Sequence, residues 1–417
     1  MVRAKGLLER PIGLRQPIIF YLGHLPAFAW NQIGRGVLGK GPMDEEFDEL
    51  FERGIDPHED DDVPQTAVWP EVEPIVRYRD LVRAGVREAL NEIDHGSKTD
   101  ELERHGRIVH LVIEHEVMHH ETLVYLLHML DEDLLREPEG WHELVLGERR
   151  EDSEPIDIPA GPATLGARFD EIPFGWDNEF DSIREHVDPF QIESLPVTVG
   201  QYFEFVRAGG YADAACWEPK SFQWRERRGL EHPISWRCEN GNWQVRSLFR
   251  WLPLEDVTGW PVHVSCAEAQ AFAKAQGARL PSEAELHRAA YGTCEGRELP
   301  FPWGEAGPDT LEGLNAGFRR GAPVPVGSAP ELQSSFGVHE LVGNGWEWTS
   351  TPFAPFPGFQ PWMRTYPGYS TDFFDDDHFV VFGGAWPTAT KLLRRSLRNW
   401  YRRHYPYVFA TFRLARS

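Results

Sequence analysis

Two histidines in the segment His-Glu-Val-Met-His, residues 115–119, have a spacing that suits a metal ion. On a helix, residues four apart lie one above the other on the same face, so the rings of His115 and His119 can reach one ion. The same face carries the apolar residues Ile108, Leu111 and Leu126. A buried imidazole needs a polar partner, and a metal ion can be that partner. A hydrogen-bonded histidine pair without a metal is the alternative interpretation.

A third ligand is expected from another helix. His24 lies in the apolar segment FYLGHLPAFAW, with Phe20 and Phe28 one turn to either side. Helical bundles build metal sites from such inward side chains on facing helices. His105 and His110 are rivals for the third position. They belong to the same predicted helix as the pair, so they cannot easily complete a triad with it.

Another four-spaced pair, Glu116 and His120, lies on a different face of the predicted helix. We expect these two side chains to face solvent or to support the ligands. Three neutral imidazoles suit iron, zinc, copper or nickel, and they leave coordination positions open for other ligands. The residues alone therefore predict a metal site without deciding which metal it binds.

The elements that position these histidines form the first third of the chain. Apolar residues recur in steps of three and four from residue 71 to 93 and, most regularly, from 102 to 130. A third apolar segment runs from residue 17 to about 38. Long helices with short loops predict an antiparallel bundle. We expect a bundle over residues 1–135 and a charged linker over 136–155.

The chain changes character after residue 156, where Gly, Pro and Trp become frequent and apolar runs shorten. Short strands are expected at 156–159 and 379–382, and helices near 199–208 and 267–276. Short strands, long loops and few helices predict an α+β domain over residues 156–417. Long ordered loops commonly carry function.

Composition limits the partners. The 417 residues include 66 acidic and 42 basic side chains, a net charge of −24, so nucleic acid and anionic membrane are poor candidates. The four cysteines form no CxxC pair, which predicts free thiols in a reducing compartment. No segment has the apolar length of a signal peptide or a membrane span. We therefore expect a cytoplasmic protein.

Taken together, these segments resemble the sulfoxide synthases of ergothioneine biosynthesis and the related selenoneine synthases. The first part resembles a DinB-like four-helix bundle. There, Gly23-His24-Leu25 and His115-Glu-Val-Met-His119 match the family's three iron ligands. The rest resembles the formylglycine-generating-enzyme domain, a C-type-lectin-like fold. The motifs that carry this second resemblance are FGWDNE (174–179), PVTVGQYFEFV (196–206), RLPSEAEL (279–286), GNGWEWTS (343–350), FGGAW (382–386) and FRLA (412–415).

One departure from the second resemblance bears on the reaction. Formylglycine-generating enzymes need cysteines near the carboxyl end to bind copper. Here the last cysteine is Cys294, far from the end of the chain. The resemblance therefore favours the chemistry of a three-histidine Fe(II) site over formylglycine formation.

The synthase resemblance implies a reaction in which Fe(II) and O2 join a thiol or selenol to C2 of hercynine, which is trimethylated histidine. Its trimethylammonium group suits an aromatic face. The segment Leu397–Tyr401 resembles the family's hercynine-binding segment, which implies a hydrogen bond from Asn399 and a cation contact from Trp400. A proton donor is also expected. The family's tyrosine aligns at Ser370 or one residue away at Tyr369, so Tyr369 is the candidate.

The same region gathers five arginines. Surface ion pairs are their expected role, and contact of some of them with the hercynine carboxylate is the alternative. The five arginines are Arg394, Arg395, Arg398, Arg402 and Arg403.

The identity of the sulfur or selenium donor depends on charge. The mycobacterial type binds γ-glutamylcysteine through arginines that this chain lacks, since no Arg or Lys occurs between Gly54 and Ile75. An acidic loop there would repel that donor. Tyr401 also stands where that type has an Asp. Both changes favour a selenosugar donor over cysteine or γ-glutamylcysteine, with cysteine as the main alternative.

Two other classes of protein share parts of this pattern. A DinB-type metal-dependent thiol transferase would have the three histidines but would consume no O2 and would not need the second domain. A non-catalytic lectin-like binding module would keep its ligand affinity without the histidines.

Overall fold

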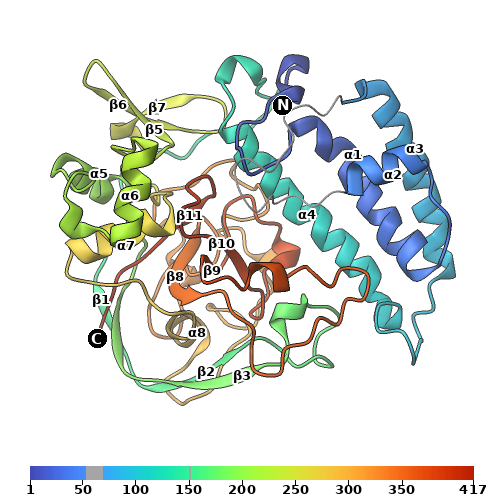
Figure 1. The fold of residues 1–417 in the computed structure, drawn as a ribbon. Helices are drawn as coiled ribbons and strands as arrows, with labels where there is room; N and C mark the ends of the chain where they lie inside the picture. The colour runs from blue at the N-terminus through green and yellow to red at the C-terminus, as the bar shows by residue number, and fades with distance from the viewer. Residues whose placement is uncertain (53–68, 150–151) are drawn as a thin grey trace. The chain divides into compact units, whose positions relative to one another are not determined.

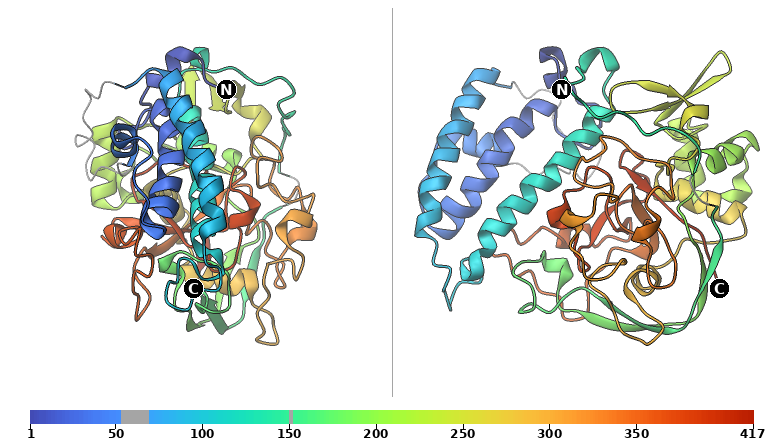
Figure 2. Two further views of the ribbon diagram at one scale, coloured as in Figure 1. Left: turned by 90° about the vertical axis from the view of Figure 1, so that its right-hand side faces the viewer. Right: turned by 180° about the vertical axis from the view of Figure 1, so that it is seen from behind.

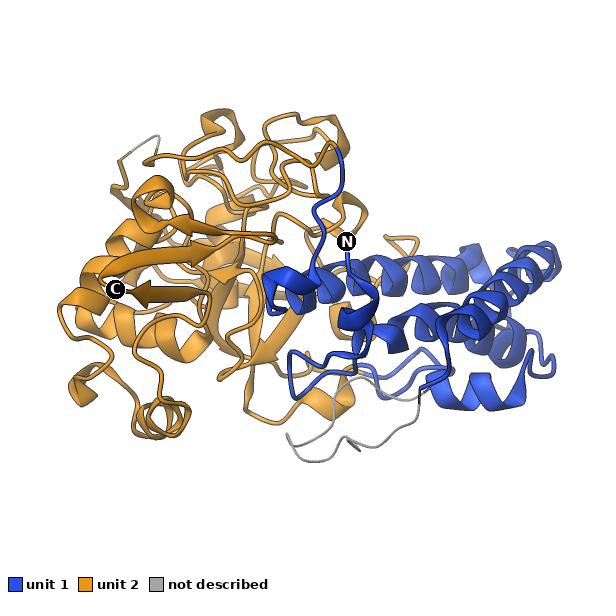
Figure 3. Ribbon diagram, turned by 90° about the horizontal axis from the view of Figure 1, so that it is seen from above, with its two compact units in different colours: residues 1–139, 360–369 blue, residues 140–359, 370–417 orange. Residues whose placement is uncertain are grey.

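The computed structural model describes residues 1–52, 69–149 and 152–417, and these fold into two compact units (Figures 1 and 3). Unit 1 contains residues 1–139 and 360–369, and unit 2 contains residues 140–359 and 370–417. A short segment from late in the chain thus belongs to the first unit. The sequence did not predict this, because no local pattern marks the segment.

Unit 1 is a helical bundle built around one apolar helix. Its helices are α1 (Ile18–Trp30), α2 (Glu45–Glu52), α3 (Val72–Ala89) and α4 (Arg107–His128). Helix α1 packs against each of the other three, and the right-hand view of Figure 2 shows α1 between α3 and α4. Nearly every side chain of α1 is buried, as expected for a helix that is apolar all round. The predicted DinB-like bundle is confirmed.

One of the predicted helix boundaries differs. The sequence pattern begins at Leu102, but α4 begins at Arg107, because His105 and Gly106 adopt left-handed backbone angles (φ 58° and 68°) that interrupt a helix. At the other end of the bundle, α1 continues as a π-helical turn from Asn31 to Val37. Such turns are rare and occur often at functional sites. The short helix α2 was not predicted.

Unit 2 contains short strands in four small sheets, together with four helices. One sheet has the order β10-β9-β8-β11 and another the order β1-β4-β12, while β2-β3 and β5-β6-β7 form the smaller two. Mixed short strands and helices confirm the predicted α+β fold. The strands are β1 (Pro155–Ile158), β2 (Gly161–Leu165), β3 (Ile183–Val187), β4 (Phe190–Glu193), β5 (Trp236–Glu239), β6 (Asn242–Arg246), β7 (Trp251–Pro253), β8 (Trp346–Pro352), β9 (His378–Phe382), β10 (Asn399–Arg402), β11 (Ala410–Thr411) and β12 (Ala415–Arg416).

The helices of unit 2 are α5 (Val199–Arg207), α6 (Pro219–Arg228), α7 (Cys266–Ala275) and α8 (Glu283–Tyr291). The predicted helices near 199–208 and 267–276 are α5 and α7. Helices α6 and α8 were missed, although α8 begins with a readable signal. Ser282 and Glu285 form a reciprocal capping box at its start. Helix α8 packs on β2, and its buried face joins the core of the unit (Figure 1).

A buried ion pair links strand β8 of unit 2 to the segment between β11 and β12. The guanidinium of Arg413 donates to both carboxylate oxygens of Glu347, at 2.6 and 2.5 Å, and both side chains are fully buried. The remaining donors reach the carbonyl oxygens of Glu193, Ser194 and His339. A buried pair offsets its desolvation cost when every donor is used in this way.

Among the residues that the structure describes, no helix has both the length and the apolar character needed to cross a bilayer.

The buried His287 in α8 predicts how the stability of the protein depends on pH. Burial, followed by the charges of Arg395 and Arg398, lowers the pKa of His287 to about 3. The unfolded chain then binds this proton more readily, with a pKa near 6.5. The stability contribution of neutral His287 is thus complete above pH 6.5 and falls as the pH drops toward 3.

We therefore expect His287→Gln to flatten the fall in unfolding free energy between pH 6 and pH 4, by up to about 1.4 kcal/mol per pH unit. Urea unfolding at several pH values measures this slope for both proteins. Equal slopes would contradict a neutral, buried His287.

Candidate metal centre

Helices α1 and α4 bring together the three predicted ligands His24, His115 and His119. Their potential ligand atoms all lie within 4.8 Å of one another, and the three side chains are buried. The Nε2 atoms of His115 and His119 are 3.2 Å apart. Among the described residues, these three histidines form the group of metal-binding side chains that lie close enough together to share one ion. A single ion can therefore contact a ring nitrogen from each of them.

The hydrogen bonds of His24 fix which nitrogen is available. Its Nδ1 lies 2.8 Å from the carbonyl oxygen of Phe51, so Nδ1 carries the proton and donates it. The other nitrogen, Nε2, then holds a lone pair. It is buried and has no hydrogen-bond partner among the described residues, as is also true of Nδ1 of His119. Buried polar atoms without a partner are rare in proteins and indicate a missing ligand.

All three imidazoles are neutral near pH 7. Burial lowers the pKa of His24 to about 4, although the Phe51 hydrogen bond acts in the opposite direction. Burial, followed by the charge of His24, holds the pKa of His115 well below its usual range. Burial and the charges of the other two histidines do the same for the pKa of His119. Neutral imidazoles are the form that binds metals, so no proton must leave first.

Aromatic rings hold the imidazoles in place. Phe28 stacks on His115 with ring centroids 3.4 Å apart, and Phe20 stacks on His24 at 4.8 Å. Gly23 explains how the Phe51 carbonyl comes near, because a Cβ at this position would lie 2.4 Å from the Phe51 ring. The Gly23-His24 pair thus combines a close helix contact with an oriented ligand.

The rival histidines lie elsewhere. His105 is exposed and His110 is only partly buried, and neither joins the group of three. Glu116 is partly exposed, with an oxygen 3.7 Å from the Arg83 guanidinium, and His120 is exposed. These two positions fit the solvent-facing role predicted for them.

Two tyrosines of the segment 360–369 lie in the same unit as the histidines. The Tyr369 hydroxyl is 3.9 Å from the sulfur of Met118 on α4. The ring of Tyr366 lies edge-on to His115, with centroids 6.5 Å apart, and to Phe28 at 5.4 Å. Sequence reasoning selected Tyr369 and missed Tyr366. Ser370 begins a return to unit 2, where it donates to Asp177 and accepts from Asn178 at 3.0 Å.

The three predicted substrate-binding residues lie on strand β10 of unit 2. Side chains alternate along a strand, so Asn399 and Tyr401 share one face while Trp400 points to the other. Accordingly, Nδ2 of Asn399 lies 3.4 Å from the Tyr401 hydroxyl. Trp400 stacks on Phe353 with centroids 4.1 Å apart, and Phe373 lies 5.5 Å away. The structure thus brings Asn399 and Tyr401 together and places Trp400 in an aromatic cluster.

The expectation of surface ion pairs for the neighbouring arginines is wrong for two of them. Arg398 pairs with Glu283 at 2.7 Å, and both side chains are buried. Arg394 pairs with the fully buried Glu179 at 2.5 Å. Both carboxylates come from distant motifs, PSEAEL and DNE, so no local signal in the arginine cluster could have revealed these partners.

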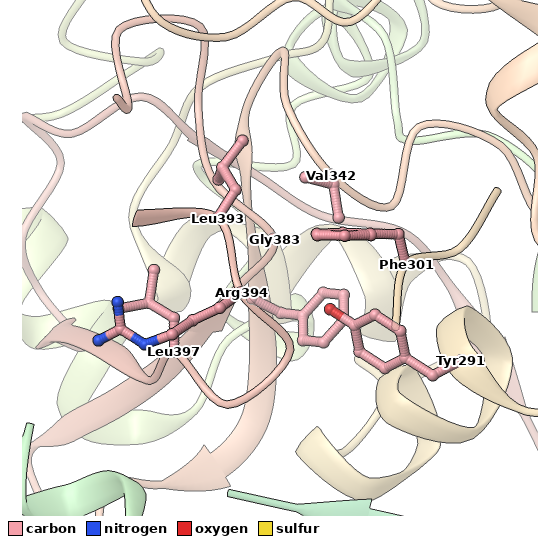
Figure 4. A pocket seen from close by; sticks show the side chains of 8 residues that line it. Tyr291, Phe301, Val342, Gly383, Leu393, Arg394 and Leu397 are labelled. Carbon is pink, nitrogen blue, oxygen red and sulfur yellow. The ribbon is translucent and has the colours of Figure 1, made fainter. Parts of the chain in front are cut away.

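A small pocket in unit 2 offers less chemistry (Figure 4). Its one charged side chain, Arg394, is already neutralised by Glu179. The pocket is lined by Tyr291, Phe301, Val342, Phe382, Gly383, Leu393, Arg394 and Leu397. We assign it to the framework of the domain.

Comparisons with known proteins cover both units. The sulfatase-modifying factor enzyme 1-like domain matches residues 143–417, and the DinB superfamily matches residues 4–123. The hercynine oxygenase of Mycolicibacterium smegmatis is 36% identical over 73% of this chain and 70% of that protein. Ergothioneine biosynthesis protein 1 of Neurospora crassa is 29% identical over 100% of this chain and 56% of that protein.

The corresponding protein of Schizosaccharomyces pombe is 28% identical over 97% of this chain and 52% of its own length. The chain therefore spans about half the length of these fungal relatives. The two domain models, matched in order, and the mycobacterial relative together show that the chain belongs to the ergothioneine-type sulfoxide synthase family.

Proposed function

We propose that this chain is an enzyme that uses Fe(II) and O2 to join a sulfur or selenium atom to imidazole C2 of hercynine. The observation that carries the proposal is the buried triad of neutral histidines, whose potential ligand atoms lie within 4.8 Å of one another and in which Nε2 of His24 has no partner among the described residues. The family relationship supplies the reaction class, since one relative is named a hercynine oxygenase.

The residues fit an iron ion. His24, His115 and His119 would hold it through neutral imidazole nitrogens, and Fe(II) with three such ligands keeps positions open for substrates. When bound, the iron would supply the electron-transfer chemistry that O2 requires. The protein contributes a buried, preorganised donor set, with His24 oriented by the Phe51 carbonyl.

Other residues would bind substrate and move protons. We propose that Tyr369 donates a proton, because its hydroxyl lies beside Met118 on the ligand-bearing helix. Asn399 would hydrogen-bond hercynine through its amide. The family resemblance also assigns Trp400 to the trimethylammonium group. Because Trp400 points to the opposite face of β10 from Asn399 and stacks on Phe353, this second contact is tested separately below. Tyr401, next to Asn399, would contact the donor.

For the donor we propose a selenosugar, with cysteine or γ-glutamylcysteine as the alternative. Tyr401 supports this choice because a phenol is neutral, and it stacks in parallel with Tyr405 at 5.8 Å, the kind of aromatic surface that suits a sugar. The second argument, the acidic loop that lacks Arg and Lys, falls mainly on residues 53–68, outside the described residues.

Removing any ligand of the triad tests the metal site. We expect His24→Ala, His115→Ala and His119→Ala each to abolish tight Fe(II) binding and hercynine-dependent O2 consumption, because two imidazoles hold the ion far less firmly. Elemental analysis and an oxygen electrode measure the two effects. His120→Ala, an exposed neighbour, is the matched control. Full iron occupancy in all three variants would disprove the site.

Trp400 can be tested through the charge of the substrate. We expect Trp400→Leu to lower kcat/KM for hercynine by up to about thirtyfold, the equivalent of a desolvated cation–π contact of about 2 kcal/mol. Imidazole propionate has the ring and carboxylate without the cation, so its turnover should change much less. Trp243→Leu on β6 is the control. Equal losses for both substrates would assign Trp400 to packing alone.

A competition assay identifies the sulfur or selenium donor. The iron-loaded protein is offered hercynine together with 1-selenoglucose, cysteine and γ-glutamylcysteine in air, and mass spectrometry identifies the adduct. We expect the selenium adduct to dominate, because the acidic loop would repel the carboxylates of the peptide donor. Preferential use of cysteine or γ-glutamylcysteine would reverse the donor assignment. Absence of any adduct and of O2 consumption would reject the proposed reaction.

A further inference from the structure

The segment 360–369 is anchored in unit 1 by one arginine. Nη1 of Arg364 donates to the carbonyl oxygen of Gly36 at 2.5 Å, and Nη2 donates to Asp100 at 2.5 Å. Gly36 belongs to the π-helical continuation of α1, and Asp100 lies in the loop that leads to α4. A single guanidinium therefore connects the extensions of the two helices that carry the histidines.

The π-helical turn is shaped to receive this segment. A Cβ at Gly36 would lie 2.6 Å from Cγ2 of Thr365, so any larger residue would push the segment away. Nε2 of Gln32, on the same turn, donates to the carbonyl oxygen of Thr365 at 3.2 Å. The close fit and the polar contacts fall on residues 364 and 365, directly before Tyr366.

Anchoring at these residues determines where Tyr366 lies. Its ring is edge-on to His115 and to the Phe28 ring that stacks on His115. Two backbone turns then fix the residues that follow Arg364. The amide of Tyr366 donates to the carbonyl oxygen of Met363 at 2.8 Å, and the amide of Tyr369 donates to the carbonyl oxygen of Tyr366 at 3.3 Å. Displacement of Arg364 would therefore weaken the contact of the Tyr366 ring with His115 and allow Tyr369 to move.

We propose that Arg364 is a positioning residue that seats Tyr366 against the His115 ring and fixes Tyr369 beside α4. Its consequence for turnover rests on the proposed function, whereas the anchoring itself does not. Arg364 and Asp100 keep 48% and 20% of their side-chain surface exposed, so water and salt reach the ion pair. Its contribution is accordingly modest and depends on salt concentration.

Hydrogen exchange of the metal-free protein tests the anchoring directly. We expect Arg364→Ala to speed exchange at the amides of Tyr366 and Tyr369 by about three- to tenfold, with the rest of α1 and α4 unchanged. High salt should produce part of the same effect in the unmodified chain. The matched control is Arg83→Ala, which removes another exposed arginine, one that faces Glu116 beside His115. Unchanged exchange in Arg364→Ala would overturn the proposal.

Two further measurements separate positioning from a general loss of fold. The double variant Arg364→Asp with Asp100→Arg restores opposite charges and should recover part of the slow exchange. With Co(II) as the probe, Arg364→Ala should shift the visible absorption spectrum and speed removal of the ion by a chelator, while Arg83→Ala should not. An unchanged spectrum and chelation rate would show that Arg364 does not act on the His115 ring.

These outcomes are independent of the reaction. If the unmodified chain shows no hercynine-dependent O2 consumption but Arg364→Ala still alters exchange and the Co(II) spectrum, the proposed function fails and the anchoring stands. If the chain is active and neither readout changes, the function stands and the anchoring is rejected.

Discussion

The desolvation of three neighbouring imidazoles is the constraint on which unit 1 depends. Burial makes protonation of His24, His115 and His119 unfavourable, and Nε2 of His24 and Nδ1 of His119 have no partner among the described residues. That arrangement costs stability unless a cation completes it, because unpaired buried polar groups lose their hydrogen bonds to water. The surrounding features, namely the carbonyl of Phe51, the absence of a side chain at Gly23 and the stacked ring of Phe28, hold the nitrogens toward a common point.

Two buried ion pairs of unit 2 show the opposite arrangement. Arg413 with Glu347, and Arg398 with Glu283, are buried pairs whose charges and donors meet within the fold. Groups satisfied in this way specify a rigid framework, whereas unsatisfied groups mark places where a ligand belongs. This pairing explains why arginines that look like surface residues in the sequence are part of the core.

The segment 360–369 shows how a late part of the chain contributes to an early domain. Its residues dock on the π-helical turn after α1, where Gly36 permits the close approach of Thr365, and they carry Tyr366 to the ring of His115. A metal site held by two helices is thus also lined by a segment that lies more than two hundred residues away along the chain.

The sequence by itself determined the features that depend on local spacing. The four-residue interval of His115 and His119 and the apolar turns around His24 predicted that these ligands lie on the helices of a bundle. The change of composition after residue 156 predicted the α+β domain. These features can be read from the sequence because periodicity is a property of neighbouring residues. The tertiary structure alone decided the contact of Phe28 with His115, the position of Tyr366 beside the triad, and the partners of Arg394 and Arg398. Each of these depends on contacts between residues far apart in the chain, and helical or strand spacing contains no information about such contacts.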